Sequence, residues 1–184
     1  MASPQSLSET DRRILALWAA DCAARVLPLF EADVPDDDRP GDAVERARAF
    51  GRGELTAAGE IRRRFVAFRS AGAAGSPAGA AAARAAAQAA AVAHMGAHAL
   101  GAAAYAAKAA GLAAGGRPGV VDTGAVKAEL HWQIRQMSGP ARTALGLLPP
   151  VGADTAGPLG PGLLASGLLG EIIRELQAEA ASGS

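Results

Sequence analysis

The chain has 184 residues, and its 18 lysines and arginines balance 18 aspartates and glutamates, so the formal net charge at pH 7 is zero. This length suits one domain with a real core rather than two ordinary domains, and the lack of a basic excess argues against a nucleic-acid binder. Half of the residues are hydrophobic, but only 4% are aromatic. Alanine is abundant and β-branched residues are sparse, which predicts an all-α fold.

The single cysteine, Cys22, excludes an intrachain disulfide and a thiolate zinc cluster, and it fits a reducing compartment. We expect Cys22 to behave as a small buried apolar residue. The polar first residues lack the apolar segment of a signal peptide, and the alanine-rich segment lacks the leucine, isoleucine and phenylalanine density of a membrane span. A soluble cytoplasmic protein without a membrane partner is therefore expected.

Residues 1–8 are expected to be disordered, and a first helix is predicted over 9–30. The expected inner face of this helix contains Trp18, Asp21 and Arg25. An unpaired buried carboxylate is costly, so Asp21 is expected to pair with Arg25 one turn later or to bond Trp18 of a neighbouring layer. The functional alternative is a place for Asp21 in a binding or catalytic site.

An acidic loop follows at residues 33–40. Three consecutive aspartates, Asp36, Asp37 and Asp38, could bind a divalent cation through carboxylate oxygens, although the loop lacks the alternation, the glycine and the terminal glutamate of an EF-hand. Alternatively, Asp38 caps the next helix, in which Pro40 takes the first position.

Two further helices are predicted over 42–58 and 60–70. The second of these carries four arginines, which form a basic patch on a neutral chain: Arg62, Arg63, Arg64 and Arg69. A solvated helix face accounts for the patch, and docking of an acidic partner is the functional alternative.

The segment from Ser76 to Gly115 is almost entirely alanine and is predicted to be one long central helix, with five to seven helices in the whole bundle. At about 100° per residue, its polar positions form a stripe on one side, flanked by Arg84 and Gln88. The stripe consists of His94, His98, Gly101, Tyr105 and Lys108. Alanine lets helices approach closely, so we expect the stripe to be shared with another helix or to line a groove. The alanine face also offers a surface for a second copy, so a homodimer is one expectation.

After a Gly- and Pro-rich stop, a helix is predicted over 124–137. Residues 139–162 are rich in Leu, Pro and Gly and are expected to pack across the bundle as irregular coil. A last helix is predicted over 163–180, and residues 181–184 are expected to be a disordered tail. Residues 9–180 are therefore expected to form a single all-α domain.

Two histidines, His94 and His98, stand one helical turn apart, which is a spacing that a transition metal can use. A third ligand would have to come from Asp21, Glu129 or His131. The intervening residues lack the glutamate of the zinc metalloprotease motif. Two hydrogen-bonded histidines in a core or a polar groove are the alternative.

The same residues could supply acid–base chemistry. His94, His98 and Tyr105 are suitable acid and base groups, and Asp21 could orient one imidazole. The sequence contains no phosphate-binding loop, no dinucleotide-binding glycine motif and no nucleophile elbow. It therefore calls for no cofactor, and whether the chain is an enzyme stays open.

Much of the chain, about residues 11–133, resembles a bacterial, largely actinobacterial, family of helical proteins regarded as immunity proteins, which are predicted to neutralise toxins. The segments that carry the resemblance are Asp11-Arg-Arg, Trp18-Ala-Ala-Asp-Cys22, Val26-Leu-Pro-Leu-Phe-Glu31, Asp38-Arg-Pro40, the stretch 43–54, the alanine-rich stretch 93–108, and Glu129-Leu-His-Trp-Gln133. Phe50 stands where the family pattern has tryptophan, and residues 88–92 lack a Gly-His pair. The resemblance implies a helical domain with a shared polar set, composed of Asp21, Asp38, Arg39, Arg48, His94, His98 and Tyr105.

Three functions are consistent with these features. The first is an immunity-like protein that blocks a toxin through an exposed face, such as the arginine patch and the acidic loop. The second is a small-molecule-binding protein or enzyme of a biosynthetic pathway, and the third is a metal-binding protein. The candidate ligand-binding residues are Trp18, Asp21, Asp38, Arg39, Arg48, His94, His98 and Tyr105. A protein binder predicts that the His and Tyr residues are packed and satisfied, whereas a ligand protein predicts that they line a solvent-connected pocket.

Overall fold

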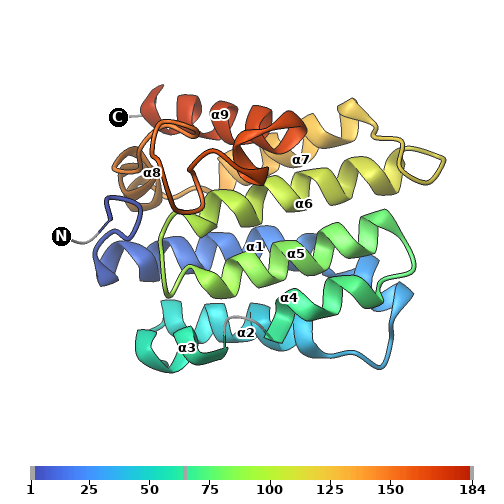
Figure 1. Ribbon diagram of the computed structural model, residues 1–184, viewed down its shortest axis with the longest axis horizontal. Coiled ribbons are helices and arrows are strands. Elements are labelled where there is room, and N and C mark those ends of the chain that lie inside the picture. The colour runs from blue at the N-terminus through green and yellow to red at the C-terminus, as the bar shows by residue number, and fades with distance from the viewer. Residues whose placement is uncertain (1–2, 64–65, 183–184) are drawn as a thin grey trace.

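Two alanine-rich helices, α5 (Pro77–Ala91) and α6 (His98–Ala114), pack against each other at the centre of the fold (Figure 1). The computed structural model describes the backbone of residues 3–63 and 66–182, and the side chains of these residues apart from 61–67. Within this described part the chain forms helices and no strand, which confirms the all-α, single-domain prediction.

The prediction of one continuous helix over 76–115 is wrong. The chain leaves the helix after Ala91, turns, and enters α6 at His98. The turn is held by the N-terminal segment, since the N–H groups of Gly96 and Ala97 donate to the carbonyl oxygens of Ser6 and Gln5 at 3.2 and 3.1 Å. A side chain at Gly96 would lie 2.6 Å from Leu7 Cδ1, so the approach of this segment requires glycine there. Hydrogen bonds from a distant part of the chain therefore replace those of a continuous helix.

The remaining helices surround this pair. They are α1 (Glu9–Asp33), α2 (Arg39–Gly51), α3 (Ala57–Arg63), α4 (Val66–Ser70), α7 (Thr123–Gln136), α8 (Gly139–Gly146) and α9 (Gly167–Ser182). Helix α1 contacts α2, α5, α6 and α8, whereas α7 and α9 cover α6. Figure 1 shows α2, α3 and α4 on one side of the central layer and α7 and α9 on the other. Most alanines of α5 and α6 are fully buried, so methyl groups fill the space between closely spaced backbones.

The described residues contain nine α-helices rather than five to seven. Two differences lie within the described residues: the alanine segment is two helices, and α8 lies inside the coil expected over 139–162. The predicted helix over 60–70 corresponds to α3 and α4, and the residues between these two lie outside the described part. The second helix also ends at Gly51 rather than near residue 58. The basic patch of Arg62, Arg63 and Arg64 lies outside the described side chains, and Arg69 is exposed.

Other boundaries agree with the sequence. Helix α1 extends past Pro28 to Asp33, and α7 starts at Thr123 after the N-cap Asp122, whose Oδ1 accepts a hydrogen bond from the N–H of Ala125 at 2.7 Å. Residues 147–162 run as irregular coil, in agreement with that part of the expectation, and Leu159 anchors this coil in the core. Helix α9 reaches Ser182, so the first half of the expected tail is helical.

The N-terminal residues expected to be disordered include a fully buried side chain, Gln5. Its Nε2 donates to Asp154 Oδ2 at 2.8 Å and to the carbonyl oxygen of Ala156 at 2.6 Å, and its Oε1 accepts from the N–H of Leu159 at 2.9 Å. Gln5 thereby fixes the coil around residues 154–159 against the N-terminal segment. We call this contact the Gln5 latch.

We expect Gln5→Ala to lower the free energy of unfolding by about 2 kcal/mol, because the Leu159 N–H loses its buried acceptor. Urea denaturation measures this change, and hydrogen exchange should show faster exchange across residues 152–160. Gln136→Ala removes an exposed glutamine and is expected to stay within about 0.5 kcal/mol of the wild type. Equal effects of the two substitutions would contradict the latch.

None of the helices in the described part of the chain is long and apolar enough to cross a bilayer. The alanine faces of α5 and α6, on which the homodimer expectation depends, are buried by other helices of the same chain. These faces are therefore not available to a second copy, and the homodimer remains an untested prediction.

Candidate functional site

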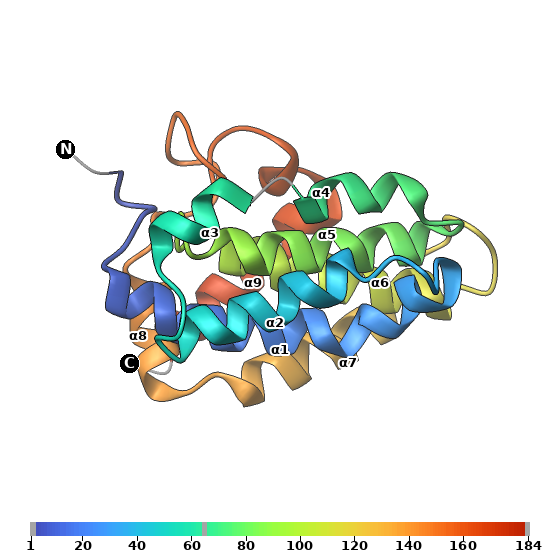
Figure 2. The same ribbon diagram turned by 90° about the horizontal axis from the view of Figure 1, so that it is seen from below.

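The residues expected to bind a ligand do not gather in one place. The structure divides them between a groove along α1 and a separate pocket beneath the 147–162 coil. Figure 2 shows these regions on different sides of the molecule, with α7 and α1 at one side and the coil at the other. His94, Asp38 and Arg39 belong to neither region.

The first region, which we call the α1 groove, lies on the outer face of α1 beside the end of α7 and the start of α8. It includes a cavity of about 360 Å³ whose lining is Ile14, Leu17, Trp18, Asp21, Gln136, Ser138 and Pro140. Leu17 is 39% exposed and lies against Gly51 of α2, where a side chain would come within 2.6 Å of it. The groove therefore presents apolar surface with a carboxylate beside it.

Ion pairs connect α1 to its neighbours α2 and α7. On the α2 side, Arg48 Nη2 donates to Asp21 Oδ1 at 3.1 Å, and Arg48 Nη1 donates to Glu45 at 2.7 Å. On the α7 side, Arg25 Nε lies 3.1 and 3.0 Å from the two carboxylate oxygens of Glu129. The guanidinium of Arg25 also stacks over the Trp132 ring, 4.0 Å from its centroid.

These contacts correct the expectation for Asp21. Its side chain is 53% exposed rather than buried, and it pairs with Arg48 rather than with Arg25 or Trp18. The helix period explains the difference, because Asp21 follows the exposed Leu17 by four residues whereas the buried face passes through Trp18 and Cys22. The indole N–H of Trp18 instead donates to the carbonyl oxygen of Gln133 at 2.9 Å.

Cys22 is buried, as expected. Burial raises the pKa of its thiol well above the ordinary value, and the nearby Glu129 and Asp21 carboxylates raise it further. A thiol with a raised pKa carries little thiolate at neutral pH, so Cys22 is a packing residue rather than a nucleophile.

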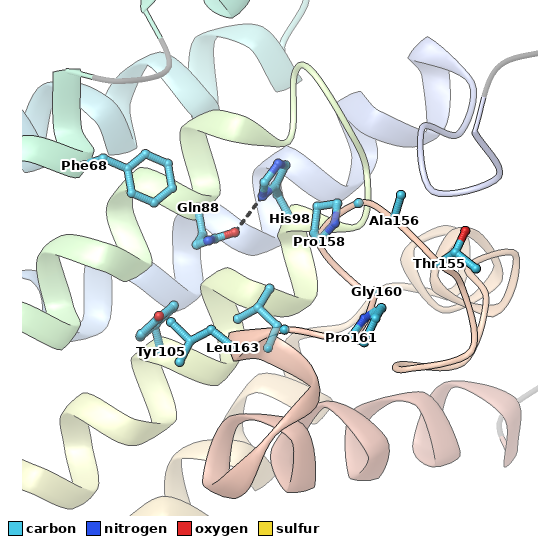
Figure 3. Close-up of a pocket in the computed structure, with 13 residues that line it drawn as sticks. Phe68, Gln88, His98, Tyr105, Thr155, Ala156, Pro158, Gly160, Pro161 and Leu163 are labelled. Carbon is cyan, nitrogen blue, oxygen red and sulfur yellow. Dashed lines mark hydrogen bonds between the residues drawn. The ribbon is translucent and has the colours of Figure 1, made fainter.

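The second region, which we call the coil pocket, is a cavity of about 300 Å³. Helix α5 contributes Gln88, helix α6 contributes His98 and Tyr105, and Phe68 comes from α4 (Figure 3). The opposite wall is the Gly- and Pro-rich coil between residues 155 and 164. His98 and Tyr105 thus line one cavity, but His94, which the ligand-protein hypothesis also expects there, is not among the described lining residues.

Gly101 makes this arrangement possible. His98, Gly101 and Tyr105 share a face of α6, as the sequence predicted, and a side chain at Gly101 would lie 2.6 Å from Gln88 Oε1. The Gln88 amide therefore crosses α6 at this glycine and reaches His98, whose Nδ1 lies 2.7 Å from Gln88 Oε1. A carbonyl oxygen accepts, so Nδ1 carries the proton and Nε2 keeps its lone pair.

Both titratable groups of the coil pocket are uncharged at neutral pH. Burial, together with a smaller effect of the neighbouring His94, lowers the pKa of His98 from 6.5 to about 4. Burial raises the pKa of Tyr105, against a smaller opposing effect of Arg84. The pocket therefore offers neutral hydrogen-bonding groups.

His94 is not part of the stripe predicted with His98. It lies in the exposed turn between α5 and α6, so the two rings are not successive turns of one helix. No group of three or more His, Cys, Asp or Glu residues is placed to hold a metal ion in the part of the chain that the structure describes. The metal hypothesis thus has no third ligand among those residues.

Asp38 and Arg39 lie at the start of α2. Asp38 occupies the N-cap position, with Pro40 in the first turn as expected, but its side chain makes no capping hydrogen bond. Arg39 pairs with Asp37 at 2.5 Å, and this pairing lowers the pKa of the Asp37 carboxyl. These residues form a local ion pair in the acidic loop.

Sequence reasoning missed several residues of both regions. In the groove, it did not identify the Arg25–Glu129 pair or Trp132, although it considered Glu129 as a metal ligand. In the coil pocket, it missed Phe68 and the role of Gln88, whose only signal was its position beside the predicted stripe.

A family model described as Imm-5 like putative immunity protein matches residues 5–140. This range contains every residue named above for the α1 groove, whereas the coil wall of the coil pocket lies beyond it. No curated protein and no solved structure gives a significant match to the chain.

Proposed function

The chain belongs to the Imm-5 like putative immunity protein family, and we propose that it binds and neutralises a toxin protein through the α1 groove. Membership of an immunity family implies a protein partner. The one cysteine among the described residues is a free, buried thiol, so we expect the encounter to take place in the cytoplasm.

One observation carries the choice of surface: the residues that line the cavity of the groove come from α1, the end of α7 and the start of α8, and all lie within the matched residues 5–140. A function shared across the family requires residues within the shared region. The coil pocket fails this criterion, because its second wall lies outside the match. The family resemblance of Asp21, Arg48 and the Glu129–Gln133 segment supports the same surface.

The chemistry of the groove suits a protein partner. Exposed Leu17 and half-buried Trp132 provide apolar contact, and tryptophan and arginine are the residue types that most often dominate binding energy at interfaces. Arg25 is held between Glu129 and the Trp132 ring, and Arg48 is held by Asp21 and Glu45. Side chains already ordered before binding lose less conformational entropy on association.

The test is neutralisation of a panel of bacterial toxin domains, each co-expressed with the chain in a bacterial host. Wild-type chain is expected to restore growth against one of them and to bind it in calorimetry. Leu17→Glu inserts a charge into the groove and is expected to weaken binding about 100-fold or more, with loss of growth rescue. Leu147→Glu is the matched control, since Leu147 is also exposed but lies outside the groove and the family match.

Two results would overturn the proposal. The first is that wild-type chain neutralises none of these toxins. The second is that Leu17→Glu and Leu147→Glu bind the toxin as tightly as the wild type, which would remove the α1 groove as the binding surface.

A further inference from the structure

We propose that the coil pocket is a binding site for a small uncharged molecule that carries an amide-like hydrogen-bond donor and acceptor on an apolar body. This site is separate from the α1 groove and independent of toxin binding. Its volume of about 300 Å³ lies at the lower end of the range of small-molecule sites.

Three polar groups in the pocket have unused hydrogen-bonding capacity. Tyr105 is 4% exposed and its hydroxyl forms no hydrogen bond with the described residues. Gln88 is 7% exposed, and within the same described residues only its Oε1 is engaged, by His98 Nδ1. The His98 Nε2 lone pair is likewise unused there. None of these three atoms is among the fully buried side-chain atoms without a partner in the described part of the chain, so they are open to the pocket, where a ligand can take the place of water.

The pattern of these groups selects the ligand chemistry. Gln88 Nε2 is a donor, His98 Nε2 is an acceptor, and the Tyr105 hydroxyl can act as either. A ligand that matches them presents an acceptor to Gln88 and a donor to His98. A primary or secondary amide carries both functions on adjacent atoms.

The described lining of the coil pocket favours an uncharged ligand. No Asp, Glu, Lys or Arg is among the described residues that line the pocket. A charged ligand would lose its hydration without gaining an opposite charge, which is unfavourable in a partly buried site. The apolar part of the ligand would contact Phe68, Pro158, Pro161 and Leu163, which face the polar groups in Figure 3.

The coil wall is held in place by the Gln5 latch. Gly157 has a φ of +79°, and a side chain there would lie 2.7 Å from Gln5 Oε1, so both the turn and the close approach require glycine. The wall is therefore fixed by specific hydrogen bonds rather than by chance packing of a loop. Residues 155–164 lie beyond the family match, so the support for this wall comes from the structure of this chain alone.

The test uses three probes of nearly equal shape and different charge: benzamide, benzoate and benzamidinium. Binding is measured on the full chain at pH 7 by chemical-shift titration of ¹⁵N-labelled protein. We expect benzamide to bind with a Kd on the order of a few mM and to shift the amides of residues 155–164. Benzoate and benzamidinium are expected to bind at least about tenfold more weakly.

Two variants localise the effect. Tyr105→Phe removes only the hydroxyl and is expected to weaken benzamide binding several-fold. Leu163→Glu places a carboxylate at an exposed position of the rim, where it does not disturb the core, and is expected to weaken it about tenfold. Leu147→Glu and Leu17→Glu, which change exposed leucines elsewhere, are expected to leave benzamide binding unchanged.

The proposal is overturned if benzamide causes no shift at about 20 mM, if the three probes bind equally, or if the shifts fall outside the coil pocket. It is also overturned if Tyr105→Phe and Leu163→Glu both bind benzamide as the wild type does. Toxin neutralisation by Leu163→Glu is a separate readout and is expected to remain intact, so the failure of either proposal is distinguishable from failure of the other.

Discussion

Replacing Ala104 with leucine is expected to lower the free energy of unfolding by about 3 kcal/mol. Ala104 is fully buried in α6, and its neighbours leave room for a methyl group but not for an isobutyl group. Because the helix backbones lie close together, no rotamer of the leucine side chain fits between them, so the helices must move apart. For a chain of 184 residues this corresponds to a melting temperature lower by roughly 6–12 °C.

The matched control is Ala113→Leu in the same helix. Ala113 is exposed near the C-terminal end of α6, so the same chemical change meets solvent and is expected to stay within about 0.5 kcal/mol of the wild type. Urea denaturation of both variants gives the comparison. A stability of Ala104→Leu equal to that of Ala113→Leu would show that the alanine core tolerates larger side chains and is not closely packed.

Acidification is expected to destabilise the wild-type protein through His98. In the unfolded chain this imidazole takes up a proton near pH 6.5, whereas in the folded protein its pKa is about 4. Between these values the unfolded state binds more protons, so the free energy of unfolding decreases as the pH falls from 6.5 to 4 and then levels off. Linkage sets an upper limit of about 3 kcal/mol, and we expect about 2 kcal/mol because the ring keeps some contact with solvent.

His98→Gln isolates this contribution. Carboxylates such as Asp37 and Glu54, whose pKa values are lowered by arginine partners, titrate in both proteins and cancel in the difference. The variant is expected to lose less stability than the wild type between pH 7 and pH 4.5. Proton NMR titration of the His98 ring provides a second measurement. A His98 ring in the wild-type protein that takes up its proton near pH 6.5 would contradict the lowered pKa.

The helical nature of the chain was predictable because it depends on local preference. Alanine strongly favours the helix, and caps such as Ser8 and Asp122 mark helix starts in the sequence. The break between α5 and α6 was not predictable from local preference, since it is stabilised by residues 5–7. One general argument was available: a continuous helix over 76–115 would be about 60 Å long, which is long for one domain of this size.

The site was harder to predict than the fold. His98 and Tyr105 share a face of one helix, so helical spacing was enough to group them. Asp21 and Arg48 come from different helices, and their pairing depends on how α1 and α2 pack, which spacing within one helix does not determine. The wall of the coil pocket comes from a Gly- and Pro-rich segment whose path is fixed by Gln5, about 150 positions earlier in the chain.

The Gln5 latch also bears on the order in which the protein is completed during synthesis. Gln5 is synthesised early, whereas its partners between Asp154 and Leu159 follow about 150 residues later. Contacts between residues so distant in sequence close long loops and tend to form late. A nascent chain that has reached residue 146 already contains the helices that line the α1 groove, whereas the coil pocket still lacks the wall formed by residues 155–164. We therefore expect the two surfaces to mature at different times, the groove before the pocket.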